Sequence, residues 1–306
     1  MSKAPPEAHR YTIGGSTFEA PSLSPGLYLI ATPIGNLRDV TIRALETLAS
    51  ADFAYCEDTR ISSRLLARYG IVKPLKPYHD HNAAKVRPEV LGRLGMGASI
   101  ALLSDAGTPL ISDPGYKLVL QAIAQGHRVE MIPGPSAPII ALALSGLPVD
   151  RFLFAGFLPA KLGERRRVLE ELKPVPAALI FFEAPGRVID ALKTIEEVLD
   201  GRRVAVAREL TKLYEEVLRG SPGEVVATME ARGGVKGEIT IVVEPPLPLP
   251  NASRDRAGAE LLAALENHSP AKAASLVAKR FGVPKKELYA LALKWKQRSG
   301  PGDGDE

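Results

Sequence analysis

The stretch LLSDAGTPLISDPG, residues 102–115, places an apolar run directly before a loop rich in Asp, Gly and Pro. With the preceding SIA, the run predicts a short buried strand, and YKLVLQAIAQG after the loop predicts a helix that stops at Gly126. The same order recurs from Gly26 to Gly146, where GLYLIAT, DFAYC and HRVEMI predict further strands. Strands that alternate with helices are typical of βαβ units, so this half is predicted to form an α/β domain around a parallel sheet.

A second α/β unit is predicted after Pro148. Five apolar runs of strand length follow it, namely RFLFAGFLP, AALIFFEA, RVAVAREL, YEEVLRG and EITIVVE, and helical patterns cover 164–172, 186–199 and 224–231. This order predicts a mixed sheet. The prolines of PPLPLPNAS, residues 245–253, remove backbone donors, so we expect a stiff linker there and only helices beyond it.

The predicted organisation is therefore two α/β domains followed by a small helical module. The boundaries are 1–25 for a disordered tail, 26–147 and 148–244 for the two domains, 245–255 for the linker, 256–297 for the module and 298–306 for a second disordered tail. Within the module, a helix from Ser269, a tight turn at 281–283 and a helix opened by Pro284 suit a helix-turn-helix. A plain helical cap fits the same pattern equally well.

Composition places the chain among ordinary globular proteins. Of its 306 residues, 45% are hydrophobic and 24% are charged, and Cys56 has no second cysteine with which to form an internal disulfide. The first residues lack the apolar core of a secretory signal, and the longest apolar stretch, APIIALALSGLP, is too short to cross a bilayer. We therefore expect a cytoplasmic protein without a transmembrane helix.

Positive charge gathers near the C-terminus. Residues 254–298 hold ten Lys or Arg against four Asp or Glu, whereas the net charge of the whole chain is only +4. Such a section is typical of a protein with a polyanionic partner, and it is also typical of a solvated helix face. A second basic run, KLGERRR, offers phosphate contacts or a solvated helix start through Lys161, Arg165, Arg166 and Arg167.

Four loops are candidates for a ligand site because each follows a predicted strand of the parallel sheet. They are TPIGNLRD at 32–39, CEDTR at 56–60, SDAGTPLISDPG at 104–115 and PGPSA at 133–137. In open parallel sheets, ligands bind beyond the carboxyl ends of the strands, and Gly and Pro let a rigid backbone approach them closely. None of the loops contains GxGxxG or GxxxxGK[ST], which argues against dinucleotide enzymes, Rossmann-type methyltransferases and P-loop NTPases.

YHDHN, residues 78–82, brings two histidines and an aspartate together. A metal site would need a third His or Cys ligand, and none stands out nearby, so a polar wall of a substrate pocket is the favoured interpretation and no metal is predicted. The acidic pair and the arginine of CEDTR could contact a nucleotide or form an internal salt bridge.

Long motifs along residues 26–297 resemble the ribosomal RNA small-subunit methyltransferase I family, which are cytidine 2′-O-ribose methyltransferases of the tetrapyrrole methylase superfamily. The motifs are ATPIGNLRDVTIRALETL, EDTR, YHDHN, LLSDAGTPLISDPGYKLV, PGPSA, DRFLFAGFLPAK, ARELTKLYEEVLRG and KGEITIVVE. The resemblance implies two α/β domains of the tetrapyrrole methylase type with S-adenosylmethionine held in the cleft between them.

The resemblance also implies a set of cofactor contacts. They are Pro33, Asp105, Gly107, Thr108, Pro109, Ile111, Ser136 and Ala137 in the first domain, and Phe182, Leu210 and Thr240 in the second. Relatives that methylate tetrapyrroles carry Gly-Asp-Pro where this chain reads Gly107-Thr108-Pro109. This departure fits the RNA branch of the superfamily.

A ribose hydroxyl is a poor nucleophile until a base within hydrogen-bond reach accepts its proton. Candidates for that base are Asp58, His79 and Glu209, and Lys212 or Arg60 could orient a phosphate. The residues alone do not rank these candidates.

The expected partners are the small ribosomal subunit with its 16S RNA and a second copy of the chain. In the module, phosphate contacts are expected from Lys285, Lys286, Lys294 and Lys296. Two alternative functions remain open, which are methylation of a tetrapyrrole and binding to the ribosome without catalysis. The basic module is unexpected in an enzyme that acts on a porphyrin.

Overall fold

The structure, a computed structural model, describes residues 9–112, 114–246, 252–281 and 284–298. The chain divides into two compact units, Met1–Pro245 and Pro246–Glu306. Residues 1–8 and 299–306 of the predicted tails, 247–251 of the predicted linker and 282–283 of the predicted turn lie outside the described residues.

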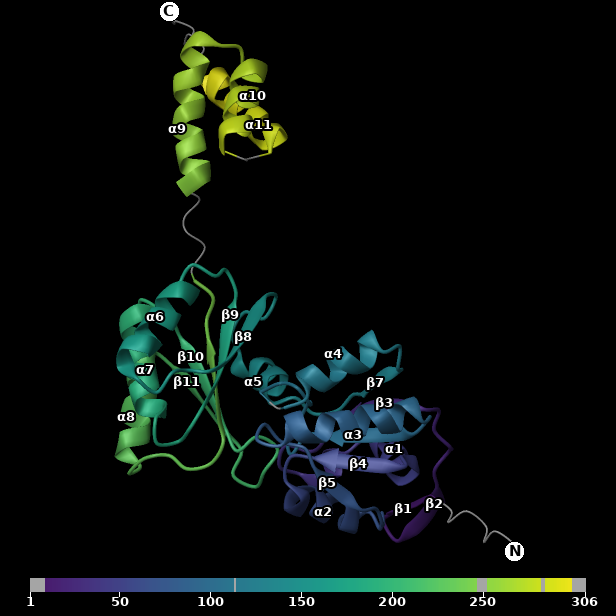
Figure 1. The fold of residues 1–306 in the computed structure, drawn as a ribbon. Coiled ribbons are helices and arrows are strands. Elements are labelled where there is room, and N and C mark those ends of the chain that lie inside the picture. Colours follow the sequence, from purple (N-terminus) through teal and green to yellow (C-terminus); the bar gives the residue numbers. More distant parts are fainter. Residues whose placement is uncertain (1–8, 113, 247–251, 282–283, 299–306) are drawn as a thin grey trace, which may run out of the picture. The chain divides into compact units, whose positions relative to one another are not determined.

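The first unit contains a parallel sheet of five strands in the order β5-β4-β6-β3-β7, with helices on both faces (Figure 1). Its central strands β3 and β6 are buried along their whole length, as expected for a parallel sheet covered on both sides. The elements are β3 (Gly26–Ile30), η1 (Leu37–Asp39), α1 (Ile42–Ser50), β4 (Phe53–Cys56), α2 (Thr59–Arg68), β5 (Leu75–Pro77), α3 (Ala83–Gly95), β6 (Ser99–Leu103), α4 (Tyr116–Ala124) and β7 (Val129–Ile132).

An antiparallel hairpin of β1 (Arg10–Ile13) and β2 (Ser16–Glu19) precedes this sheet, where we expected part of a disordered tail over 1–25. Tyr11 is buried in the core beside α1, and the Thr12 N–H donates to the carbonyl of Tyr69 over 2.7 Å. The expectation was wrong for the hairpin. The polar, Gly-rich composition of this segment predicts disorder, but the buried side chain of Tyr11 packs the hairpin against the core.

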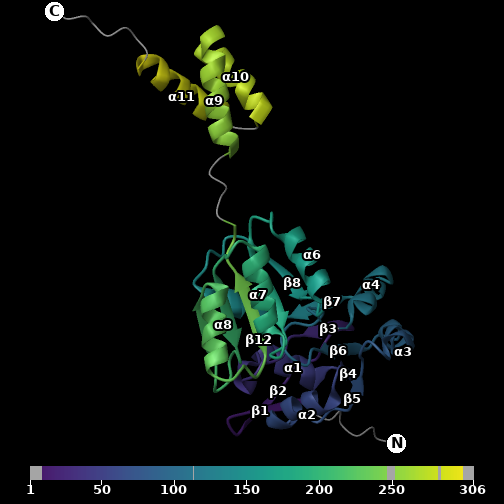
Figure 2. The ribbon, with the colours of Figure 1, turned by 90° about the vertical axis from the view of Figure 1, so that its left-hand side faces the viewer.

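The first unit also contains a mixed sheet of five strands in the order β11-β10-β12-β9-β8, in which only β8 and β9 are parallel. This agrees with the mixed sheet that the sequence predicts. Helices α6, α7 and α8 cover one face of it (Figures 1 and 2), and α5 lies on the other (Figure 1). The elements are α5 (Ala137–Ser145), β8 (Phe152–Phe157), α6 (Leu162–Leu172), β9 (Ala178–Glu183), α7 (Val188–Val198), β10 (Val204–Arg208), β11 (Glu216–Gly220), α8 (Pro222–Ala231) and β12 (Ile239–Val243).

Helix α5 follows the first sheet in sequence but packs on the second. Its Leu142 lies in one apolar cluster with Ile180 of β9 and Val242 of β12. At its C-terminal end, Nε of Arg219 donates to the carbonyl of Ser145 over 3.0 Å. These contacts explain why the two predicted α/β domains form a single compact unit.

The second unit contains three helices, in agreement with the helices predicted beyond the linker, although the first of them begins at Ala252, inside the linker predicted over 245–255. They are α9 (Ala252–Asn267), α10 (Pro270–Phe281) and α11 (Lys285–Arg298). Leu261, Val277 and Leu288, one from each helix, are buried together in its core. Among the described helices of the whole chain, none is long and apolar enough to span a membrane.

Candidate functional site

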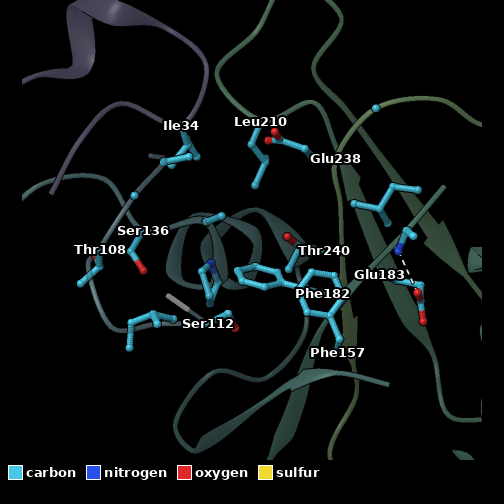
Figure 3. A pocket seen from close by; sticks show the side chains of 18 of the residues that line it. Ile34, Thr108, Ser112, Ser136, Phe157, Phe182, Glu183, Leu210, Glu238 and Thr240 are labelled. Atoms are coloured by element: carbon cyan, nitrogen blue, oxygen red, sulfur yellow. Dashed lines mark hydrogen bonds between the residues drawn. The ribbon is translucent and has the colours of Figure 1, made fainter. Parts of the chain in front are cut away.

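A cavity of about 440 Å³ lies between the carboxyl edge of the first sheet and the second sheet. Figure 3 shows Ile34, Thr108 and Ser136 on one side of it, with Phe182 and Thr240 opposite. The first wall comes from loops that follow β3, β6 and β7, which is the edge at which parallel sheets bind ligands. The volume is in the range of sites for small organic molecules.

Hydrogen bonds tie the loops of the first wall together. The Thr32 N–H donates to the Gly107 carbonyl over 2.9 Å, and the Gly107 N–H donates back to the Thr32 carbonyl over 3.0 Å. The Thr108 hydroxyl donates to the carbonyl of Pro135 over 3.2 Å. Gly107 has a φ of +80°, and a Cβ there would lie 3.2 Å from Cγ2 of Ile34. A side chain at position 107 would therefore be both strained and crowded.

Most of the cofactor residues implied by the resemblance lie around this cavity. Those that line it are Gly107, Thr108, Ile111, Ser136, Ala137, Phe182, Leu210 and Thr240. Pro33, Asp105 and Pro109 are not among the lining residues. Asp105 lies directly before the lining residue Ala106, and its Oδ1 accepts the N–H of Asp58 over 2.9 Å. That bond joins the loop after β6 to the loop after β4.

The cavity also has lining residues that sequence reasoning missed, among them Ile34, Phe157, Glu183 and Glu238. Strand β8 shifts register against β9 between Phe154 and Phe157, and Gly156 within this bulge has a φ of +69°. Bulges re-aim side chains, and here the Phe157 ring lies 5.5 Å from that of Phe182 on the cavity wall. Gly156 was the only available signal, because apolar runs do not reveal a change of register.

Two candidate bases are held in ion pairs outside the cavity lining. Asp58 caps α2 and pairs with the Arg60 guanidinium at 2.5 Å, and hydrogen bonds from Arg60 lower the pKa of Asp58 to about 2. Glu209 Oε1 accepts from Nζ of Lys212 at 2.8 Å and from the Glu238 N–H at 2.9 Å. The bond from Lys212 is the main cause that lowers the pKa of Glu209. Both carboxylates are therefore weak bases.

The pKa of Asp105, in contrast, is raised. Burial raises its pKa above the usual value of an aspartate, and the negative charge of Asp58 raises it further, against the lowering effect of the hydrogen bond from the Asp58 N–H. A raised pKa makes a carboxylate a stronger base at neutral pH.

The third candidate base, His79, lies in the loop between β5 and α3 and is not among the residues that line the cavity. Its backbone N–H donates to Oδ1 of Asn82 over 2.9 Å, and its Nδ1 is buried without a hydrogen-bond partner among the described residues. The His79 and His81 rings lie 6.0 Å apart. In the described part of the chain, no cluster of three or more His, Cys, Asp or Glu side chains is arranged to hold a metal ion.

The basic residues at the start of α6 are less available for phosphate contacts than the sequence suggests. Lys161 is exposed, but Arg165 is only 5% exposed and its Nε donates to the Thr194 hydroxyl over 3.0 Å. Arg165 is therefore a structural residue, which corrects its predicted role as a phosphate contact. Arg166 pairs with Glu197 at 2.7 Å, and Arg167 lies 3.8 Å from Glu171.

In the second unit, the lysines predicted to contact RNA lie on α11. Lys285, Lys286 and Lys294 are exposed, whereas the side chain of Lys296 lies outside the described residues. Helix α11 follows α10 after a short connection, as the recognition helix does in a helix-turn-helix.

Two family models match the chain. Residues 26–226 match the model described as Tetrapyrrole (Corrin/Porphyrin) Methylases, and residues 251–296 match the model described as RsmI C-terminal HTH domain. The first match runs from β3 into α8, so it covers the parallel sheet and all of the mixed sheet except β12. The second match covers α9, α10 and most of α11.

Two relatives are similar over nearly their whole length. The ribosomal RNA small subunit methyltransferase I of Mesorhizobium japonicum is 51% identical over 296 residues, which are 95% of this chain and 99% of that protein. The protein of the same name from Erythrobacter litoralis is 51% identical over 279 residues, 90% of this chain and 98% of that protein. The solved structure of a diphthine synthase has a TM-score of 0.57 at 15% identity, over 71% of this chain and 89% of that chain, which indicates a shared fold alone.

Proposed function

We infer the function of this chain from its family, because the chain belongs to the tetrapyrrole methylases and, among them, to the ribosomal RNA small subunit methyltransferase I family. It transfers a methyl group from S-adenosylmethionine to the RNA of the small ribosomal subunit. The observation that carries this function is the match to such a relative along 95% of the chain. A tetrapyrrole substrate is not favoured, because the terminal helices match a domain of the RNA enzymes as well.

The residues around the cavity suit S-adenosylmethionine. Gly107 leaves room for close approach to the backbone, Phe182 and Leu210 offer apolar contacts, and the hydroxyls of Ser136 and Thr240 can hydrogen-bond to polar groups. When bound, the cofactor supplies an electrophilic methyl group that needs little further activation. The work left to the chain is to position the acceptor hydroxyl and to take its proton.

We propose that the acceptor is a cytidine 2′-hydroxyl of 16S RNA, as the resemblance implies, and that Asp105 takes its proton. Asp105 precedes the cavity wall directly, and its raised pKa suits a base better than the lowered values of Asp58 and Glu209. His79 then serves as a polar wall of the acceptor pocket. Small ribosomal subunits lie in the cytoplasm, so we propose that compartment for the enzyme.

A homodimer is proposed on the strength of an exposed apolar face of α4. Tyr116, Leu120 and Ile123 are large apolar side chains that are all exposed in the single chain. Their spacing places them on one side of the helix. An apolar stripe of this kind marks an interaction site, and a second copy offers a matching stripe.

Gly107→Val is expected to weaken S-adenosylmethionine binding at least tenfold, which is about 1.4 kcal/mol, because the new side chain crowds Ile34 and fills the approach to the backbone. The measurement is calorimetry without added metal, followed by transfer of labelled methyl groups to purified small subunits. The matched control is Gly97→Val, since Gly97 has a φ of +84° in open space.

The control should share the loss of stability from a positive φ but keep normal affinity for the cofactor. Equal affinity in both variants would contradict a cofactor site at this cavity. Cofactor binding without any methyl transfer in the natural chain would favour the third interpretation, a ribosome-binding protein without catalysis.

Asp105→Asn is expected to lower the transfer rate by about 10² or more, the usual contribution of a general base. In the natural chain, the rate should fall with decreasing pH through a pKa above the usual aspartate value, because only the ionised carboxylate accepts a proton. The comparison variant is Asp58→Asn, which keeps an N-cap for α2 and the N–H that bonds to Asp105. It should lose far less activity than Asp105→Asn, and its pH profile should move to lower pH because the charge that raises the pKa of Asp105 is removed.

Asp105→Asn should also be more resistant to unfolding by urea than the natural chain near pH 8. A carboxyl group with a raised pKa in the folded state stabilises the fold below its unfolded pKa and loses that contribution as the pH rises through the folded value. The difference between the two proteins should therefore narrow towards pH 4. An unchanged rate for Asp105→Asn would rule out Asp105 as the base.

Lys285→Glu with Lys286→Glu is expected to reduce methyl transfer to small subunits and to leave cofactor affinity unchanged. Two phosphate contacts on α11 are replaced by repulsion, so the loss should resemble inhibition by salt. The control makes the same change of charge on α10, as Lys272→Glu with Lys279→Glu, and should reduce methyl transfer less. Full activity of the α11 variant at physiological salt would assign the module to a purpose other than RNA contact.

Leu120→Glu with Ile123→Glu is expected to convert a dimer to a monomer in sedimentation analysis, because the charges cannot be buried between two copies of α4. Val72→Glu, at an exposed position outside α4, is the control and should not change the mass. A natural chain that sediments as a monomer at all concentrations would contradict the proposed dimer.

A further inference from the structure

The loop between β10 and β11, residues 209–215, carries two large apolar side chains into solvent. Near its start, Leu210 is buried and lines the cavity proposed to bind the cofactor. At its tip, Leu213 is 88% exposed and Tyr214 is 70% exposed. The loop therefore leads from the proposed cofactor site to an apolar pair at the surface.

The backbone of this loop is strained. Glu209 has a φ of +50° and Thr211 has a φ of +66°, although neither is glycine. For a β-branched residue such as threonine, this region is a true outlier. Strain of this kind persists where the surrounding structure enforces it, and it gathers at binding sites.

Hydrogen bonds hold the loop in this shape. The Thr211 hydroxyl accepts the N–H of Asn36 over 3.1 Å, and the Thr211 N–H donates to Oε2 of Glu215 over 2.6 Å. Nζ of Lys212 bonds to Glu209 at 2.8 Å and lies 3.3 Å from Glu238. The exposure of Leu213 and Tyr214 is thus imposed by a braced loop.

The surroundings of the apolar pair indicate the kind of ligand. Lys212 packs against Gly35, where an added Cβ would collide with its side chain, and exposed Arg38 follows two residues after Asn36. The Lys212 ammonium is already paired with Glu209 and Glu238. Arg38, on the loop that Asn36 bonds to Thr211, is therefore the cation offered to a phosphate. An exposed tyrosine ring on a loop bonded to one that carries an arginine suits a flat group attached to a phosphate chain. Unpaired RNA bases are recognised by stacking on aromatic side chains in this way.

We propose that Tyr214, supported by Leu213, stacks on an unpaired base of the ribosomal RNA next to the reacting ribose. This inference rests on the proposed RNA substrate. Two side chains are too small a patch for a stable protein interface. Stacking at this point would place the ribose near the cavity and leave cofactor binding to other residues.

The test is steady-state methyl transfer to purified small subunits by the full chain, with separate values for KM and kcat. Tyr214→Ala should raise the KM for subunits about tenfold, within the range of one base stacked on an aromatic ring. Tyr214→Phe, which keeps the ring, should stay within about twofold of the natural chain. Affinity for S-adenosylmethionine should not change in either variant.

The matched control is Met96→Ala, which removes an apolar side chain that is 80% exposed at the end of α3. It should leave KM unchanged. An unchanged KM in Tyr214→Ala overturns the proposal, as does a Tyr214→Phe variant impaired equally, because the hydroxyl would then be the contact. A changed mass in sedimentation assigns the pair to a protein interface instead. If the natural chain transfers no methyl group to small subunits, the proposed RNA substrate is itself wrong. This result is obtained before any variant is compared, so it is distinct from a failure of the stacking proposal.

Discussion

The reciprocal hydrogen bonds between Thr32 and Gly107 are the contact on which the cavity depends. Strands β3 and β6 are neighbours in the sheet, and this pair continues their association into the loops beyond its edge. A positive φ at position 107 lets the second loop turn back, and a Cβ there would be in tight contact with Cγ2 of Ile34, at 3.2 Å. Backbone hydrogen bonds therefore hold this wall together, while side chains such as Ile34, Thr108 and Ser136 provide its surface.

Helix α5 carries that rigidity to the second sheet. Its first residues, Ala137 and Pro138, line the cavity, while its body packs against β9, β10 and β12. One helix therefore belongs to the wall of the first sheet and to the core of the second. The distance between the two walls is then set by the packing of a core, which is far stiffer than a hinge between separate domains.

The sequence predicts the parts of this arrangement that follow from apolar runs and from loops rich in Gly and Pro. The buried strands β3 and β6 are of this kind, since they lie within unbroken apolar stretches. It does not predict features that arise from packing or register. Tyr11 docks a hairpin through one side chain, Phe157 reaches the cavity through a bulge, and Arg165 is buried through a bond to Thr194. Each depends on a partner distant in the chain, so the local pattern does not reveal it, apart from Gly156 at the bulge.

The two aspartates at the sheet edge show how neighbours divide chemical roles. The Asp58 carboxylate pairs with the Arg60 guanidinium and accepts the Arg60 N–H in the first turn of α2, and these contacts keep it ionised. The Asp58 N–H donates to Oδ1 of Asp105 and fixes the position of that side chain. The charge of Asp58 in turn raises the proton affinity of Asp105. Burial is the main cause of the raised pKa of Asp105, and the charge of Asp58, which Arg60 partly offsets, adds to it. Asp58 is therefore better understood as a residue that positions and tunes a base than as the base itself.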